Sequence, residues 1–325
     1  MITHHESLRK FYTQLEYVLA NYTPHNLNLA DYNNIVIAGL GGSGIGGKLT
    51  KSYFINQMPI PVDTVSDYTL PAYVNNKTLL ILCSYSGNTE ETLSVFEQGK
   101  EKGCKMLAVT AGGKLMELAT ANNLKYYTIE GGFQPRMALG YSFGFLLKIF
   151  AELLKQDIDG EFAVCIENLK DQNEHTEAAE GILKKFASTL ENKYVVIADA
   201  AFEATAIRAC QQFQENSKKE AFCNVLPEAN HNVIESYYGK LAGNFILLNS
   251  GSHERVDARF EFVNGLLDKD NNKVVHIAVE EFNLKMIFSV IHKLDWLTIR
   301  IAEETNQNPM EIENIISLKD FLSNQ

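Results

Sequence analysis

The segment Leu82–Leu93, which reads LCSYSGNTEETL, decides the fold that the sequence predicts. It places three hydroxyl side chains, Ser84, Ser86 and Thr89, within six residues, and the Gly-Asn pair between them is typical of a tight turn. An apolar run of strand length precedes it, and apolar residues at helical spacing follow it. We therefore expect a strand, a polar turn and a helix, with Thr89 at the helix N-terminus, where backbone N–H groups and the macrodipole favour an anion.

The same residues also fit an ordinary loop that caps the following helix, so this segment alone leaves both interpretations open. A second turn upstream favours the anion site. The residues Gly39–Gly47, GLGGSGIGG, follow the apolar run Asn34–Ala38 and carry Ser43 at their centre. Glycine costs conformational entropy, so this density of glycine indicates that the backbone comes close to something.

The glycine-rich turn also contains a GxGxxG pattern, which occurs in dinucleotide-binding proteins. That interpretation requires an acidic residue about twenty positions further on. Asp63 and Asp67 are both candidates for it. A nucleotide-dependent dehydrogenase therefore stays an alternative on this motif alone.

The composition is that of a globular enzyme and argues against several classes of partner. The chain has 325 residues, of which 46% are hydrophobic and 10% aromatic, and this length calls for two domains. Its formal net charge of -11 argues against nucleic-acid and anionic membrane surfaces, and no apolar run reaches the length of a membrane span. The five cysteines are scattered without a CxxC pair, which indicates neither a disulfide framework nor a zinc site. We expect a cytoplasmic protein.

Apolar runs alternate with helical patterns in both halves, which predicts an α/β fold with parallel sheets flanked by helices. We expect two tandem, doubly wound domains, residues 1–155 and 156–325, with further helices at the C-terminus. Ligands of such sheets bind at the carboxyl ends of the strands, where both hydroxyl-bearing turns fall. The expected strands are Ile35–Ala38, Val62–Ser66, Thr78–Cys83, Lys105–Thr110 and Tyr126–Ile129 in the first domain, and Lys193–Ala198, Asn244–Leu248 and Lys273–Val279 in the second.

The second half holds a carboxylate and an imidazole that suit proton transfer. Glu215 lies in the phrase QENSK, and His231 follows sixteen positions later in NHN. Carboxylates serve as general bases, and histidine moves protons near neutral pH. Glu215 equally fits an exposed helical carboxylate paired with Lys218 or Lys219, and His231 fits a loop histidine bound by a neighbouring asparagine. Spacing alone favours these ordinary accounts.

Two single cations also have both an ordinary and a functional interpretation. Arg136 follows Pro135 at the predicted start of a long apolar helix that runs to Leu154, and a surface ion pair is the usual role of such an arginine. Lys319 lies in the last predicted helix, Met310–Leu322, where a lysine also suits the helix dipole.

Several motifs in the same order resemble the bifunctional phosphoglucose/phosphomannose isomerase family, whose chains consist of two sugar isomerase (SIS) domains. The resemblance covers nearly the whole chain, from Gly39 to Lys319. It implies phosphosugar binding at the carboxyl ends of the strands. The matching phrases are GLGGSG, SYSGNT, PRMALGY, QENSK, NVLPEANHN and IISLK.

The resemblance implies an isomerase that converts glucose 6-phosphate, and mannose 6-phosphate as a second aldose, into fructose 6-phosphate without a cofactor or a metal. Glu215 would move the proton through a cis-enediol, while His231 and Lys319 would assist ring opening. Arg136 would stabilise the negative charge that develops on oxygen. The residues expected to hold the substrate phosphate are Gly42, Ser43, Ser84, Ser86 and Thr89.

The resemblance also implies a homodimer with shared active sites, in which the neighbouring subunit supplies the histidine. Glu228 and Glu235 are alternative carboxylates, and the resemblance places Glu228 in a structural turn. One position departs from the archaeal relatives: Ile312 stands seven residues before Lys319, where they carry a threonine that is linked to accepting both epimers. A non-catalytic phosphosugar-sensing SIS protein and another SIS-type sugar-phosphate isomerase are the alternatives.

Overall fold

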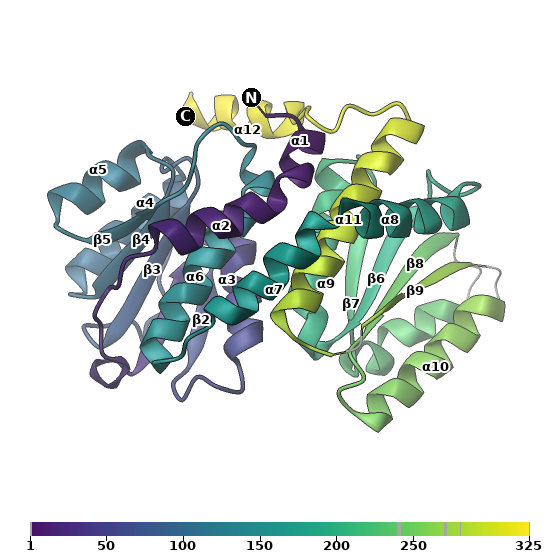
Figure 1. The fold of residues 1–325 in the computed structure, drawn as a ribbon, viewed down its shortest axis with the longest axis horizontal. Helices are drawn as coiled ribbons and strands as arrows, with labels where there is room; N and C mark the ends of the chain where they lie inside the picture. Colours follow the sequence, from purple (N-terminus) through teal and green to yellow (C-terminus); the bar gives the residue numbers. More distant parts are fainter. Residues whose placement is uncertain (1, 239–241, 270–271, 280, 325) are drawn as a thin grey trace. The chain divides into compact units, whose positions relative to one another are not determined.

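The computed structural model describes residues 2–238, 242–269, 272–279 and 281–324 (Figure 1). The chain divides into two compact units, Met1–Asp171 with Asn283–Phe288 and Gln172–Phe282 with Ser289–Gln325. The domain boundary expected between residues 155 and 156 lies ahead of this division and stays a prediction.

The first unit is built on a parallel sheet with the strand order β2-β1-β3-β4-β5 (Figure 1). All five strands predicted for this half are confirmed, with ends that shift by at most one residue. The chain reverses its direction of travel across the sheet between β1 and β3, which is where such folds bind ligands. The strands are β1 Asn34–Ala38, β2 Val62–Val65, β3 Thr78–Ser84, β4 Lys105–Thr110 and β5 Lys125–Thr128.

Helices cover both faces of this sheet, which is why its central strands read as unbroken apolar runs. On one face, Val36 and Leu80 pack in a cluster with Phe96 and Leu115 of helices α4 and α5. On the other, a Cβ on Gly47 of α3 would lie 2.8 Å from a methyl group of Ile37. The helices that follow the strands are α3 Gly41–Phe54, α4 Glu90–Glu101, α5 Gly113–Ala121 and α6 Leu139–Leu154, and α7 Asp159–Lys170 comes after them.

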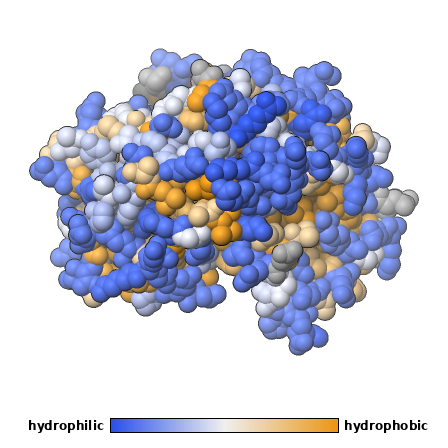
Figure 2. Space-filling model, viewed as in Figure 1, coloured by the Kyte–Doolittle hydropathy of each residue, from blue (hydrophilic) through white to orange (hydrophobic). Residues whose placement is uncertain are grey.

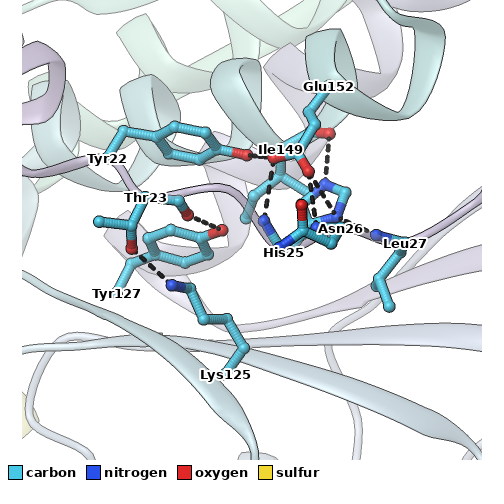
Figure 3. A network of polar contacts seen from close by, with 9 residues as sticks. All are labelled: Tyr22, Thr23, His25, Asn26, Leu27, Lys125, Tyr127, Ile149 and Glu152. Carbon is cyan, nitrogen blue, oxygen red and sulfur yellow. Dashed lines mark hydrogen bonds and ion pairs between the residues drawn. The ribbon is translucent and has the colours of Figure 1, made fainter.

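A polar network around Glu152 ties the segment before β1 to helix α6 (Figure 3). Two helices, α1 His4–Arg9 and α2 Phe11–Asn21, precede that segment. The Glu152 carboxylate accepts hydrogen bonds from the Tyr22 hydroxyl at 2.5 Å and from the Asn26 N–H at 2.7 Å. Burial opposes ionisation, but these hydrogen bonds outweigh it and lower the pKa of Glu152.

His25 belongs to the same network and is held in its neutral form. Its Nδ1 accepts the N–H of Leu27 at 2.9 Å, so the ring proton sits on Nε2, which lies 3.1 Å from the Ile149 carbonyl. Burial lowers the pKa of His25, because the charged form would lose water. These contacts need an ionised Glu152 and a neutral His25, so they stabilise the segment most near neutral pH.

The second unit is built on a parallel sheet with the strand order β7-β6-β8-β9. The three strands predicted for this half are confirmed, but β7 was not predicted. In β7 only the two terminal residues, Ala221 and Leu226, are buried, so it lacks the continuous apolar run that marks the others. The strands are β6 Lys193–Asp199, β7 Ala221–Leu226, β8 Gly243–Asn249 and β9 Lys273–Ala278.

Helices also cover both faces of the second sheet. Ile197 and Phe245 pack with Phe260 of α10 on one face, and Tyr194 stacks on Phe213 of α9 on the other, with ring centroids 4.4 Å apart. The helices are α8 Gln172–Phe186, α9 Glu203–Glu215, α10 Glu254–Lys269, α11 Leu284–Glu304 and α12 Glu313–Ser323. The apolar stripe expected along α11 is confirmed as buried at Leu284, Ile287, Val290, Ile291, Leu294 and Leu297.

Hydrophilic residues cover most of the face shown in Figure 2, and hydrophobic residues reach the surface in separate patches. Within the described ranges, no helix combines the length and the apolarity that a membrane crossing needs. Helix α12 is unusual because Ile316, Leu318 and Phe321 are 51%, 57% and 60% exposed. An apolar surface of this kind is typical of a site that contacts another molecule.

Candidate active site

The two hydroxyl-bearing turns lie side by side at the carboxyl ends of the neighbouring strands β1 and β3. The N–H of Tyr85 donates to the Oγ of Ser43 at 3.0 Å, which joins the turn after β1 to the turn after β3. Within the second turn, the Oγ of Ser84 lies 2.8 Å from the Oγ1 of Thr89. The structure thus brings these predicted hydroxyls together in the first unit.

Both turns lead directly into helices. Thr89 is the N-cap residue of α4, in extended conformation, as predicted. Helix α3 begins at Gly41, so Gly42 and Ser43 lie in its first turn. The N–H of Ser43 donates to the Leu40 carbonyl at 3.0 Å, and the earlier first-turn N–H groups are of the kind that attracts anions. Ser43 and Ser84 are buried, whereas Ser86 is exposed and accepts the N–H of Asn88 at 3.2 Å.

Close backbone approach explains the glycines of both turns. A Cβ on Gly42 would lie 2.9 Å from the carbonyl oxygen of Pro135 and 3.1 Å from the Cα of Arg136. Gly87 has φ +70°, and a Cβ there would lie 1.8 Å from the carbonyl oxygen of Gly112. Any other residue at these positions would push the turns apart.

Arg136 lies beside the start of α3 but not at the start of the long apolar helix, and that part of the prediction is wrong. It belongs to a separate 3₁₀ turn, Pro135–Met137, and α6 begins only at Leu139. A surface ion pair does not describe it either, because its side chain is 3% exposed. The approach of this turn to Gly42 places the arginine's backbone next to the hydroxyl-bearing turns.

Of the two acidic candidates for dinucleotide binding, Asp63 is engaged elsewhere. Asp63 lies within β2, and its carboxylate accepts hydrogen bonds from the Tyr73 hydroxyl at 2.7 Å and from the Lys51 amine at 3.2 Å. The hydrogen bond from Tyr73 contributes most to lowering the pKa of Asp63. The strand order of this sheet is also that of flavodoxin-like folds rather than the dinucleotide-binding order. Both observations argue against a dehydrogenase.

Glu215 lies in the second unit, as the last residue of α9, and lines a pocket of about 370 Å³. The two residues after it are buried and fixed on α11. The Asn216 amide donates to the Thr298 hydroxyl at 3.0 Å, and the Ser217 hydroxyl donates to the Thr298 carbonyl at 2.7 Å. This anchoring holds the half-buried side chain of Glu215 at the pocket.

The segment Glu311–Ile315 lines the same pocket, so Ile312 borders the same space as Glu215. The lysines considered as partners of Glu215 make other contacts. Lys219 forms an ion pair with Glu191 at 2.6 Å, and the Lys218 amine donates to the backbone carbonyl of Glu215 at 2.5 Å.

His231 is exposed at the end of the 3₁₀ turn Glu228–His231, which follows the cis peptide bond Leu226–Pro227. The Asn230 side chain accepts from Arg259 at 3.3 Å, and the Asn232 amide donates to Glu228 at 3.1 Å. Glu228 is thus part of a turn, as the resemblance implies.

The remaining candidates lie on other elements of the second unit. The other alternative carboxylate, Glu235, lies on the next 3₁₀ turn, Val233–Tyr238. Lys319 is exposed on α12. In the part of the chain that the structure describes, neither Lys319 nor His231 lines the Glu215 pocket.

Sequence reasoning missed two contributors to the Glu215 pocket. Thr298 is a polar residue in the apolar helix α11, and that break in the pattern was its only signal. Lys218 stood in the recognised phrase QENSK, but helical spacing assigned it an ion pair rather than a backbone contact.

The comparisons with known proteins agree with these observations. Residues 28–131 match the model of the SIS domain, and residues 180–322 match the model of the bacterial phospho-glucose isomerase C-terminal SIS domain. The bifunctional phosphoglucose/phosphomannose isomerase of Caldicellulosiruptor bescii is 35% identical over 323 residues, which cover 95% of each chain. The enzyme of the same name from Aquifex aeolicus is 34% identical over 322 residues, or 96% of each chain.

A solved structure shows the same fold in a more distant protein. The glucosamine-6-phosphate deaminase of Thermotoga maritima aligns with a TM-score of 0.72 at 14% identity, over 94% of this chain and 96% of that one. The fold is therefore that of two SIS domains, as predicted. By its sequence, from end to end, the chain belongs to the bifunctional phosphoglucose/phosphomannose isomerase family.

Proposed function

We propose that this isomerase interconverts glucose 6-phosphate and fructose 6-phosphate, and that mannose 6-phosphate is its second aldose. The observation that carries the proposal is the pair of hydroxyl-bearing turns, joined by Tyr85 and Ser43, at the ends of two neighbouring strands. Such an arrangement suits one phosphate group, and relatives with this activity are 34% and 35% identical.

The phosphate would be held by Ser43, Ser84, Ser86 and Thr89 together with first-turn N–H groups, including that of Gly42. Binding energy from the phosphate, which does not react, would position the sugar carbons for proton transfer. The buried hydroxyls cannot reorient freely, so the site is organised before the substrate arrives.

The proton would be moved by the Glu215 carboxylate. After ring opening, which His231 and Lys319 would assist, Glu215 takes the proton from C2 of the aldose and returns it to C1. The intermediate is a cis-enediol, and Arg136 stabilises the negative charge on its oxygen. The substrate carbons exchange oxidation states internally, so the reaction needs no external oxidant or reductant.

The two aldoses differ only in configuration at C2. Rotation about the C2–C3 bond of the open chain would present either epimer to the same base. Ile312 lines the same pocket as Glu215, so we expect Ile312→Thr to change the ratio of mannose 6-phosphate to glucose 6-phosphate formed from fructose 6-phosphate. An unchanged ratio would remove Ile312 from the determinants of specificity.

A coupled assay with fructose 6-phosphate, in which both aldose products are followed separately, tests the proposal. Glu215→Gln keeps the shape and removes the base, so its kcat should fall by about a hundredfold to ten-thousandfold. Glu220→Gln removes an exposed carboxylate of the same unit; it is the matched control and should keep the parent kcat. If Glu215→Gln is as active as the parent chain, the base is another residue.

We also propose that the protein is a cytoplasmic homodimer with shared active sites. The exposed apolar side chains of α12 support a contact with a second copy, and the five cysteines are free thiols, as is usual in a reducing compartment. Sedimentation of the purified protein should give twice the mass of one chain. A monomer at micromolar concentration would contradict the dimer.

A further inference from the structure

Lys218 has a backbone conformation that its residue type rarely adopts. It lies just after α9 with φ +57°, in the left-handed region. That conformation is strained for a non-glycine residue, and glycine would fit there with less strain. A lysine at this position therefore suggests a role for its side chain.

The Lys218 side chain connects the end of α9 with a segment that lies 93 residues after Lys218 in sequence. Its Nζ donates to the carbonyl oxygen of Glu215 at 2.5 Å and to that of Glu311 at 2.8 Å. The first carbonyl ends α9, where a positive charge also complements the helix dipole. Hydrogen bonds from a charged donor are stronger than neutral ones.

Both segments that Lys218 joins are walls of the same pocket. Glu215 lines it from the end of α9, and Glu311 begins the segment Glu311–Ile315 that also lines it. The Glu215 side is already fixed, because Asn216 and Ser217 bind Thr298 of α11. The Lys218 amine links the segment Glu311–Ile315 to this fixed end of α9.

We propose that Lys218 is a positioning residue that sets the distance between the Glu215 carboxylate and the Glu311–Ile315 wall. A sugar between the two walls then lies at one place relative to the base. The proposal deepens the proposed function and rests on it only where it concerns the sugar. Misplacement of reacting groups by about 1 Å can cost up to a hundredfold in rate.

The kinetic test compares three variants of the full chain. Lys218→Met keeps the length and the backbone strain but removes the donors, so kcat for fructose 6-phosphate should fall on the order of tenfold while KM changes little. Lys218→Arg restores two donors and should recover most of the loss. Lys193→Met is the control, since it removes an exposed lysine whose ion pair with Glu220 is also exposed.

Two kinetic outcomes would overturn the proposal. Parent-like kcat in Lys218→Met would show that the link does not matter for turnover. A rise in KM with unchanged kcat would show that the amine contacts the substrate directly. Lys218→Gly guards against misfolding, because it relieves the left-handed strain, and it should lose kcat as Lys218→Met does without losing stability.

Hydrogen exchange tests the link without reference to any reaction. The N–H of Ile316 donates to the Ile312 carbonyl at 3.0 Å and reports on the order of the wall. Its exchange should speed up on the order of tenfold in Lys218→Met and stay unchanged in Lys193→Met. Unchanged exchange in both would refute the link. If the parent chain proves inactive on hexose 6-phosphates, the exchange result still decides whether Lys218 orders this wall.

Discussion

The turns that follow the central strands differ between the two units. The strand orders themselves are equivalent, with β2-β1-β3 in the first sheet and β7-β6-β8 in the second. In the first unit, the turns after β1 and β3 meet through a serine hydroxyl and glycines. In the second, the equivalent turns after β6 and β8 meet through Asp199. Its carboxylate accepts the N–H of Ser250 at 2.7 Å, the hydroxyl of Ser250, and the N–H of Phe202 at 3.1 Å.

This difference indicates which of the two units can bind an external anion. The ends of neighbouring parallel strands at a topological switch present N–H and hydroxyl donors in both units. In the second unit, the buried carboxylate of Asp199 already satisfies them. In the first unit, the corresponding strand β1 ends in Ala38, which carries no charge. The comparison supports the proposal that the phosphate binds in the first unit.

Two glycines in equivalent turns give the sharpest test of this difference. Gly87 and Gly251 both have positive φ, but a Cβ on Gly87 would meet Gly112 at 1.8 Å, while one on Gly251 meets nothing within 4 Å. Gly87→Ala must displace the turn proposed to bind the phosphate, so we expect kcat/KM to fall by about a hundredfold or more in steady-state assays. Gly251→Ala should cost only about 1 kcal/mol of stability and leave kcat/KM unchanged. If both substitutions lowered kcat/KM equally, the proposed difference between the two turns would be refuted.

Removing the internal anion should harm stability rather than activity. Asp199→Ala leaves the buried donors of Ser250 and Phe202 without their acceptor, and we expect a loss of about 3 kcal/mol in the free energy of unfolding. Urea denaturation measures this loss, and Asp199→Asn, which keeps an acceptor oxygen, should lose less. A variant that folds as stably as the parent but has a raised KM would show that this turn takes part in substrate binding.

Single hydroxyls should have smaller effects. Ser86 is exposed in the first turn pair, and Ser252 is exposed in the second. A hydrogen bond to a charged group contributes about 1.5 to 3 kcal/mol when well formed. Ser86→Ala should therefore raise KM for fructose 6-phosphate by about tenfold, less than a fully buried contact would. Ser252→Ala should leave KM unchanged, and a matching rise there would contradict the assignment.

Acid should lower the free energy of unfolding of both units. A change of pH should therefore distinguish the two units least. Burial lowers the pKa of His25 in the first unit and that of His292 in the second well below the ordinary 6.5. His175 adds to the second effect, and the indole N–H of Trp296 donates to His292 at 3.2 Å.

Because the unfolded chain binds these protons first, the stability that depends on the neutral histidines is complete above about pH 6.5 and falls as pH drops below it. Urea titrations at several pH values should show this slope. His25→Gln should reduce the slope that belongs to the first unit. A slope that neither His25→Gln nor His292→Gln alters would refute the assignment.

The sheets and the first turn pair could be predicted because local sequence determines them. Strands buried on both faces appear as apolar runs, and turns that need glycine show it directly. Strand β7 was not predicted because its interior residues are partly buried or exposed and form no apolar run. Arg136 was predicted to lie in the long helix, but Pro135 begins a separate short turn that precedes this helix.

The contacts that complete the sites could not be predicted in the same way. Asp199 meets Ser250 across 51 positions, and Lys218 meets Glu311 across 93. Neither pair leaves a periodic signal, because only the fold brings the two segments together. Glu215 and His231 were singled out by resemblance, and their catalytic roles stay predictions.

The network around Glu152 limits how the chain can be divided. Glu152 and its partners Tyr22 and His25 all lie outside residues 28–131, the stretch that matches the SIS model, yet Tyr22 stacks on Tyr127 within it at 5.1 Å. A fragment trimmed to that match would lose both flanks and uncover an aromatic ring. The smallest autonomous module should therefore extend from the first helices through α6, and limited proteolysis should release a piece of that size rather than the shorter one.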